Sequence, residues 1–240
     1  MHMKLSACAA WAPGLCDISA WRSWRGAPPA DDGSAPEVRF VDAMMRRRLG
    51  RLSRMALHVA NEVAAGLTSL TTKVSTVFAS RHGELSRTVD ILHALAADEA
   101  PSPTAFSLSV HNSAAGIFSI IRANHAPSTA LAADDETLLW ALQDAAIRLA
   151  TDPDLVILLI YADEPLPGEY RQFSSVKESA HALAFLLQAG EGMNLEWAEN
   201  RGLPPSREPL SLAIMANLLG HRDRLVWHGE RLSVQGRHHA

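Results

Sequence analysis

Cysteines and long apolar runs are scarce in this sequence. Only Cys8 and Cys16 occur among its 240 residues, both within the first 16 positions. They form no framework of disulfides, which favours a reducing compartment and predicts a cytoplasmic protein. No segment approaches the roughly 18 consecutive apolar residues of a membrane span. Residues 5–8 have the form of a lipoprotein cleavage box but lack the preceding apolar stretch of about 7–15 residues, so we expect no export signal.

The signatures of cofactor, metal and hydrolase sites are also absent. The sequence contains no Gly-x-Gly-x-x-Gly after a predicted strand, no Gly-x-x-x-x-Gly-Lys-Ser/Thr and no His-Glu-x-x-His. The histidines are too scattered for a zinc site, and no Gly-x-Ser-x-Gly marks a hydrolase nucleophile. The 22 basic and 26 acidic side chains give a formal charge of −4, which does not favour a surface that binds nucleic acid. The sequence therefore predicts no metal, no cofactor and no nucleic-acid partner.

The composition is that of a globular protein. Apolar residues make up 48% of the chain and charged residues 20%. The length suits one large domain or two small ones. Because the sequence contains no internal repeat and no long linker, we expect a single domain over residues 1–240.

Strands and helices are predicted to alternate, which indicates an α/β fold. Strands are expected at 3–10, 74–80 and 155–161, and the continuous apolar run of 155–161 is typical of a strand covered on both faces. Apolar spacing predicts a long helix that begins at Asp42 and carries a buried face to Val63, and further helices at 85–97, 113–121 and about 134–150. After Pro165 the pattern changes to strands at 181–188, 193–197, 225–228 and 232–235, with a helix near 208–219.

Four segments, in order along the chain, resemble one known family. They are Arg-Arg-Arg-Leu-Gly-Arg-Leu-Ser-Arg-Met-Ala at 46–56, Ser-Arg-His-Gly-Glu-Leu at 80–85, Ser-Pro-Thr-Ala-Phe-Ser-Leu-Ser-Val-His-Asn-Ser-Ala-Ala-Gly at 102–116, and Ser-Thr-Ala-Leu-Ala at 128–132. Together they resemble the β-ketoacyl synthase family, specifically the short N-terminal-half proteins that act as chain length factors in aryl polyene gene clusters. The resemblance covers residues 3–187 and leaves 188–240 as a divergent C-terminal cap. It implies a truncated thiolase-like α/β fold, the N-terminal half of a ketosynthase, in which a layered sheet and helices are followed by short C-terminal strands.

The resemblance also predicts that the chain is not a condensing enzyme by itself. The family's nucleophilic cysteine follows a Thr-Ala pair at a helix N-terminus, where the helix dipole stabilises a thiolate. Here Thr129-Ala130 is followed by Leu131, which has no lone pair to attack a thioester. The histidines that assist the family's reaction come from its second half, and the surroundings of His221 and His228 do not match them.

What the resemblance implies instead is a steric role. A chain length factor pairs with an intact β-ketoacyl-ACP synthase as a heterodimer and shapes the tunnel that receives the growing acyl chain in polyene or fatty-acid-like synthesis. By position, the tunnel wall is expected to contain Thr88, Leu92, Leu95 and Phe106. Ordinary core packing is the other interpretation of these four residues.

Two further surfaces follow from the resemblance. The subunit interface is expected to include His111, Asn112, Ala115, Phe118, Thr129 and Leu131. Arg46, Arg47, Arg48 and Arg51 are expected to dock the acidic acyl carrier protein, although a solvated cationic face or a place in the subunit interface also explains them.

The sequence leaves two other functions open. One is a stand-alone acyl thioester hydrolase or transferase that uses His82 or His111 as its base. The other is a scaffold without an acyl pocket.

Overall fold

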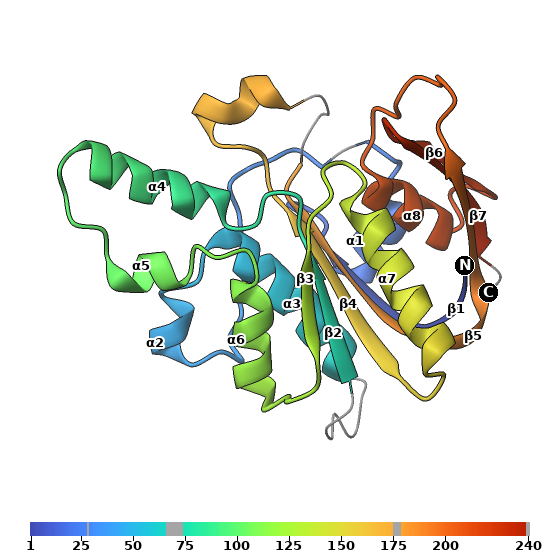
Figure 1. The fold of residues 1–240 in the computed structure, drawn as a ribbon, viewed down its shortest axis with the longest axis horizontal. Coiled ribbons are helices and arrows are strands. Elements are labelled where there is room, and N and C mark those ends of the chain that lie inside the picture. The colour runs from blue at the N-terminus through green and yellow to red at the C-terminus, as the bar shows by residue number, and fades with distance from the viewer. Residues whose placement is uncertain (28, 66–73, 175–178, 239–240) are drawn as a thin grey trace.

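The computed structural model describes residues 1–27, 29–65, 74–174 and 179–238, and a mixed seven-stranded sheet forms its centre (Figure 1). The strands follow the order β3-β2-β4-β5-β7-β6, and β1 also pairs with β5. β2, β3 and β4 are parallel to one another, whereas β5 is antiparallel to its neighbours. The predicted α/β class of fold is confirmed. The strands are β1 (His2–Trp11), β2 (Val74–Ala79), β3 (Ser128–Leu131), β4 (Val156–Asp163), β5 (His181–Glu199), β6 (Leu225–His228) and β7 (Leu232–His238).

Helices cover both faces of the sheet. On one face lie α3 (Arg51–Ala65) and α6 (Ser113–Arg122), and on the other α1 (Ile18–Ser23), α7 (Thr137–Thr151) and α8 (Leu210–Leu218). Because successive side chains of a strand point to opposite faces, Leu158 of β4 packs with α3 and α6, while Leu159 packs with α7 and α8. The apolar run in β4 is therefore buried on both sides, as predicted. None of the helices in the described ranges is long and apolar enough to cross a membrane.

The strand β5 is longer than the sequence predicts. Two strands were expected at 181–188 and 193–197, but one strand runs from His181 to Glu199. Gly190 and Gly192 lie between the expected strands with φ of 136° and 140°, a region of backbone geometry that glycine adopts readily. They let the strand continue past β1 instead of ending there. As a result β5 pairs with β4 and β1 along its first part and with β7 along its last, and the segment after residue 188 extends the same sheet.

The long helix predicted to begin at Asp42 is divided in two. The prediction of one helix from Asp42 to Val63 is wrong, because α2 (Ala43–Arg46) ends before α3 begins at Arg51. The buried carboxylate of Glu84 lies at the start of α3 and accepts a hydrogen bond from the Ser53 backbone N–H at 3.2 Å and another from the Ser53 hydroxyl. A Cβ atom at Gly50 would lie 2.3 Å from this carboxylate, so a side chain at this position would displace Glu84. An acceptor at the helix N-terminus thus fixes the break.

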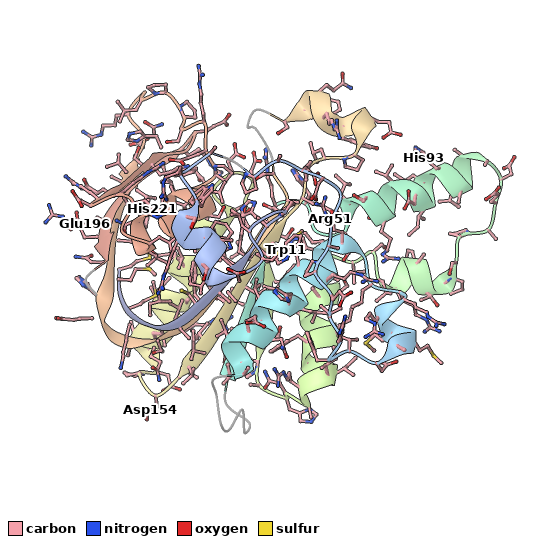
Figure 2. All side chains as sticks on the ribbon, turned by 180° about the vertical axis from the view of Figure 1, so that it is seen from behind. Trp11, Arg51, His93, Asp154, Glu196 and His221 are labelled. Carbon is pink, nitrogen blue, oxygen red and sulfur yellow. The ribbon has the colours of Figure 1, made fainter. Side chains whose placement is uncertain are left out.

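The helices α4 (Leu85–Ala96) and α5 (Pro103–Ser107) form an arm that extends away from the sheet. Figure 2 shows His93 on the part of α4 that lies far from the body of the molecule. Ser102 caps α5, and Pro103 occupies the first turn of this helix, where proline is tolerated. A 3₁₀ helix, η1 (Gly168–Phe173), follows β4, and its Glu169 pairs with His93 at 3.1 Å.

Candidate functional site

A small cavity lies where the carboxyl ends of the parallel strands meet. Its volume is about 40 Å³. That space holds water molecules but not an acyl chain. Its lining includes Arg81, Asp135, Tyr161, Asp163, Glu164 and His181.

The Asp163 carboxylate joins the ends of β2 and β4. One oxygen accepts hydrogen bonds from the Ser80 hydroxyl at 3.0 Å and from the Arg81 backbone N–H at 2.8 Å. The other accepts the Tyr161 hydroxyl proton at 2.5 Å. Burial is the main reason why the pKa of Tyr161 lies well above its usual value, and the neighbouring Asp163 charge adds to it. Tyr161 therefore remains a hydrogen-bond donor to Asp163.

A buried Ser–His pair lies beside this network. The Nδ1 atom of His181 is 2.7 Å from the Ser179 carbonyl oxygen, which only accepts, so Nδ1 carries the proton. Burial lowers the pKa of His181, and the neutral Nε2 accepts the hydroxyl proton of Ser211 at 2.6 Å. Both residues are almost completely inaccessible, and Ser211 does not line the cavity. The pair therefore joins the start of β5 to α8 rather than exposing a nucleophile to substrate.

The turn between β3 and α7 directly follows Leu131, the residue that the resemblance matches to the nucleophile. Leu131 is the last residue of β3, and α7 begins only at Thr137. The helix N-terminus is thus formed by Asp134, Asp135 and Glu136, and Leu131 is not the residue located there. Asp134 has a φ of 52°, which is uncommon for a residue with a side chain. The turn 132–136 contains no cysteine, serine or threonine.

Glu136 anchors the C-terminal strands to this turn. Its buried carboxylate accepts the backbone N–H groups of Arg231 at 2.9 Å and Leu232 at 2.8 Å, at the turn between β6 and β7. The Arg231 guanidinium also lies 3.2 Å from it. This carboxylate therefore serves to position the hairpin.

The histidines proposed as bases do not form a catalytic pair with Ser80. The Nε2 atom of His111 lies 2.8 Å from the Ser80 carbonyl oxygen, not from its hydroxyl. The Ser80 hydroxyl instead donates to Asp163 and accepts from the Gly83 N–H. His82 lines the cavity but is not placed against Ser80 by these contacts. This geometry does not favour a hydrolase built on residues 80–83.

The residues expected in the subunit interface differ in their exposure. Ala115 and Phe118 are buried and pack in the core of this chain, so they face its interior rather than a partner. Asn112 is exposed, and with Gly116 and Ile120 it forms the outer face of α6. His111, Thr129 and Leu131 are half-buried, and Arg148 donates a hydrogen bond to Thr129.

The residues expected in the tunnel wall lie mainly on the surface of the arm. Leu92, Leu95 and Phe106 are exposed by 48%, 52% and 64%, so they are not core residues of this chain. Thr88 is half-buried, and its hydroxyl donates to the Glu84 carbonyl oxygen at 3.3 Å. A mainly apolar groove of about 440 Å³ lies beside the arm, between α2 and α5.

The four arginines do not share one helix face. Arg51 donates to Asp31 at 2.6 Å and to the Ser34 carbonyl at 2.7 Å, and it holds the preceding loop against α3 (Figure 2). Arg47 and Arg48 are exposed and Arg46 is half-buried. Within the described ranges, these three side chains form no ion pair with a carboxylate. Only part of the predicted set is thus available to an acidic partner.

These elements identify the class of protein to which the chain belongs. The sequence model described as "Beta-ketoacyl synthase, N-terminal domain" matches residues 21–234. The chain therefore belongs to the family of β-ketoacyl synthase N-terminal domains, and its layered sheet is the fold of that domain. No curated protein matches it.

Solved structures give more particular similarities. The chain is 26% identical to a chain in the complex of the ketosynthase ApeO with its chain length factor ApeC from Xenorhabdus doucetiae, with a TM-score of 0.85 over 99% of each chain. A chain of the ishigamide ketosynthase/chain length factor is 18% identical over 92% of this chain and 74% of that one, with a TM-score of 0.63. A β-ketoacyl synthase from Burkholderia phymatum STM815 is 11% identical over 92% and 71%, with a TM-score of 0.64. The last two support the fold alone.

Sequence reasoning missed the centre of this site. Asp163, Glu164 and His181 received no role, although Asp163 ends β4 and Glu164 follows it, and this strand was predicted. Polar residues at the carboxyl ends of parallel strands meet at one edge of a sheet, so this position was a usable signal. His181 and Ser211 are 30 residues apart, and their contact has no local signal in the sequence.

The raised pKa of Glu164 predicts that the stability of the folded chain depends on pH. Burial is the main cause that raises its pKa to about 7 from 4.5; the Ser86 hydroxyl at 3.1 Å opposes the rise, and the Glu84 charge adds to it. Between these values the folded chain keeps a proton that the unfolded chain has lost. The free energy of unfolding should therefore fall by about 3 kcal/mol as the pH rises through this window.

Urea denaturation at several pH values tests this expectation. Glu164→Gln should remove most of the decline and make the chain more stable than the wild type near pH 8. Glu99→Gln, at an exposed carboxylate, serves as the control and should show the same decline as the wild type. Equal declines in the wild type and in Glu164→Gln would show that another group is responsible.

Proposed function

We propose that this chain is a non-catalytic, chain length factor-like subunit that pairs with an intact β-ketoacyl-ACP synthase and shapes its acyl tunnel. The observation that carries the proposal is the similarity over 99% of both chains to a chain of a ketosynthase–chain length factor complex. The product class that we infer is a polyene or fatty-acid-like chain, as in aryl polyene clusters. This last inference rests on the sequence motifs of residues 46–56, 80–85 and 102–116.

The strand-end site supports a non-catalytic role. The turn that precedes α7 offers carboxylates where the family uses a thiolate, and a carboxylate does not replace a cysteine in thioester exchange. The adjoining cavity is too small for an acyl chain. We therefore infer that the condensation reaction takes place in the partner subunit.

An edge strand and a helix supply a surface for that partner. β3 ends the sheet and pairs only with β2 among the described strands, so one side of its backbone is left to pair with another chain. The outer face of α6 lies next to it and carries Ile120, which is 70% exposed. A partner that covers β3 and α6 would remove this side chain from water.

The projecting arm supports the tunnel proposal. Leu92, Leu95 and Phe106 are apolar, yet they lie on a surface that nothing in the described chain covers. A tunnel wall shared by two subunits is expected to leave apolar side chains uncovered in each separate subunit, because each subunit contributes only half of the wall. In that arrangement Phe106 and Leu92 set how far an acyl chain can extend.

Arg47 and Arg48 are the best-placed residues for carrier docking. Both are exposed beside the groove between α2 and α5, and Arg48 contributes to its lining. Exposed cations accelerate encounters with an acidic protein such as acyl carrier protein. We infer a cytoplasmic location, which the two free and exposed cysteines support.

Size-exclusion chromatography of the chain co-expressed with its ketosynthase tests the heterodimer. We expect the two proteins to elute together. Ile120→Arg should weaken the complex by roughly 30-fold, since a charge would be buried without a partner. Ile147→Arg on α7 is the matched control and should leave the complex intact. Elution of the wild-type chain as a stable monomer in the presence of the ketosynthase would reject the proposal.

Product analysis of the complex tests the tunnel wall. Phe106→Ala or Leu92→Ala should lengthen the product by at least one extension unit, because space opens at the end of the tunnel. Phe173→Ala removes an equally exposed aromatic ring from η1 and should leave the length unchanged. An identical product distribution in all three variants would remove Phe106 and Leu92 from the tunnel.

Binding kinetics with acyl carrier protein test the docking surface. The double variant Arg47→Glu/Arg48→Glu should slow association about tenfold at low ionic strength, and the difference should shrink as salt is added. Arg201→Glu, an exposed charge reversal on another loop, is the control for net charge. An equal effect of both variants would indicate general electrostatics and no specific docking at α2.

A further inference from the structure

The Arg81 side chain fills the space at the ends of the parallel strands. It is only 11% exposed, and it follows directly after β2. Its Nε atom lies 2.9 Å from Asp134 Oδ1, and its Nη1 atom lies 2.9 Å from Asp135 Oδ1. Its backbone N–H donates to Asp163. One residue thus connects the ends of β2 and β4 with the turn that follows β3.

This ion pair lies in the turn between Leu131, which the resemblance matches to the family's nucleophile, and the start of α7. Asp134 and Asp135 belong to the turn before α7, and the left-handed φ of Asp134 directs that turn. A backbone in this region is strained and persists where surrounding contacts hold it. The bidentate geometry of a guanidinium suits two neighbouring carboxylates. Arg81 and Asp135 also line the cavity, of which only about 40 Å³ remains.

We propose that Arg81, fixed by Asp134 and Asp135, is a steric plug that keeps acyl thioesters out of this chain and so leaves the partner as the single acyl-binding subunit. The purpose of the plug rests on the proposed function, but its existence is a property of this chain. Arg81 is then a specificity-determining residue: it sets which subunit of the pair holds the acyl group.

Two substitutions separate the volume of Arg81 from its charge. Arg81→Ala removes both and should open the cavity. Arg81→Met removes the charge but keeps most of the side-chain length, so it should leave the cavity filled. The probe is the acetyl thioester of N-acetylcysteamine, titrated into the chain alone or into the complex. With ¹⁵N label in this chain only, amide shifts report binding here and not in the partner.

We expect Arg81→Ala to bind the probe at least tenfold more tightly than the wild type, with shifts confined to residues around the cavity. Arg81→Met should behave as the wild type does. A folded Arg81→Ala variant that binds no better than the wild type would overturn the proposal. Equal gains in both variants would also overturn it, because exclusion would then depend on charge and not on volume.

If Arg81→Ala does not fold, the double variant Arg81→Ala/Asp135→Asn replaces it. In this variant one of the two carboxylates that pair with Arg81 is replaced by a neutral amide. The same titration applies, with Asp135→Asn alone as its control. Co-elution with the ketosynthase distinguishes a failure of the plug proposal from a failure of the proposed function. A complex that forms while the opened chain ignores the probe rejects only the plug, whereas a wild-type chain that never joins a ketosynthase rejects the proposed function.

Discussion

The structure depends most on the requirement that the polar groups at the carboxyl ends of β2, β3 and β4 satisfy one another. Asp163 meets this requirement at the centre by accepting hydrogen bonds from Ser80, Arg81 and Tyr161. A buried carboxylate is stable only when donors compensate for lost hydration. The strand ends, the turn before α7 and the start of β5 are therefore fixed together around one carboxylate.

The same constraint explains why this edge of the sheet suits a structural role. A condensing enzyme needs an open space in which a thiolate meets a thioester. Here the corresponding turn carries Asp134, Asp135 and Glu136, of which the first two hold Arg81 and the third holds the turn between β6 and β7. The groups that stabilise the fold occupy the space that chemistry would need. The surfaces to which the proposed function assigns a role, the β3 edge, α6 and the arm of α4 and α5, all lie outside the core.

Much of the fold was predictable because its signals are local. The apolar run of β4 and the helical spacing of α7 each identify one element without reference to the rest of the chain. The errors occurred where distant residues decide. The break before α3 depends on Glu84, which lies 31 residues after Ser53, and the continuity of β5 depends on Gly190 and Gly192 beside β1. The site was predicted least well, since no role was assigned to Asp163 or His181, whose contacts with Ser80 and Ser211 join distant segments.

The sequence alone determined the α/β class, the family resemblance and the presence of leucine rather than cysteine after Thr129-Ala130, because these follow from periodicity and residue identity. Only the tertiary structure decided that Leu92, Leu95 and Phe106 are surface residues of an arm, that Ala115 and Phe118 are core residues, and that Arg81 lines the strand-end cavity. Exposure and long-range contact depend on how separate segments pack. No local sequence pattern predicts that packing.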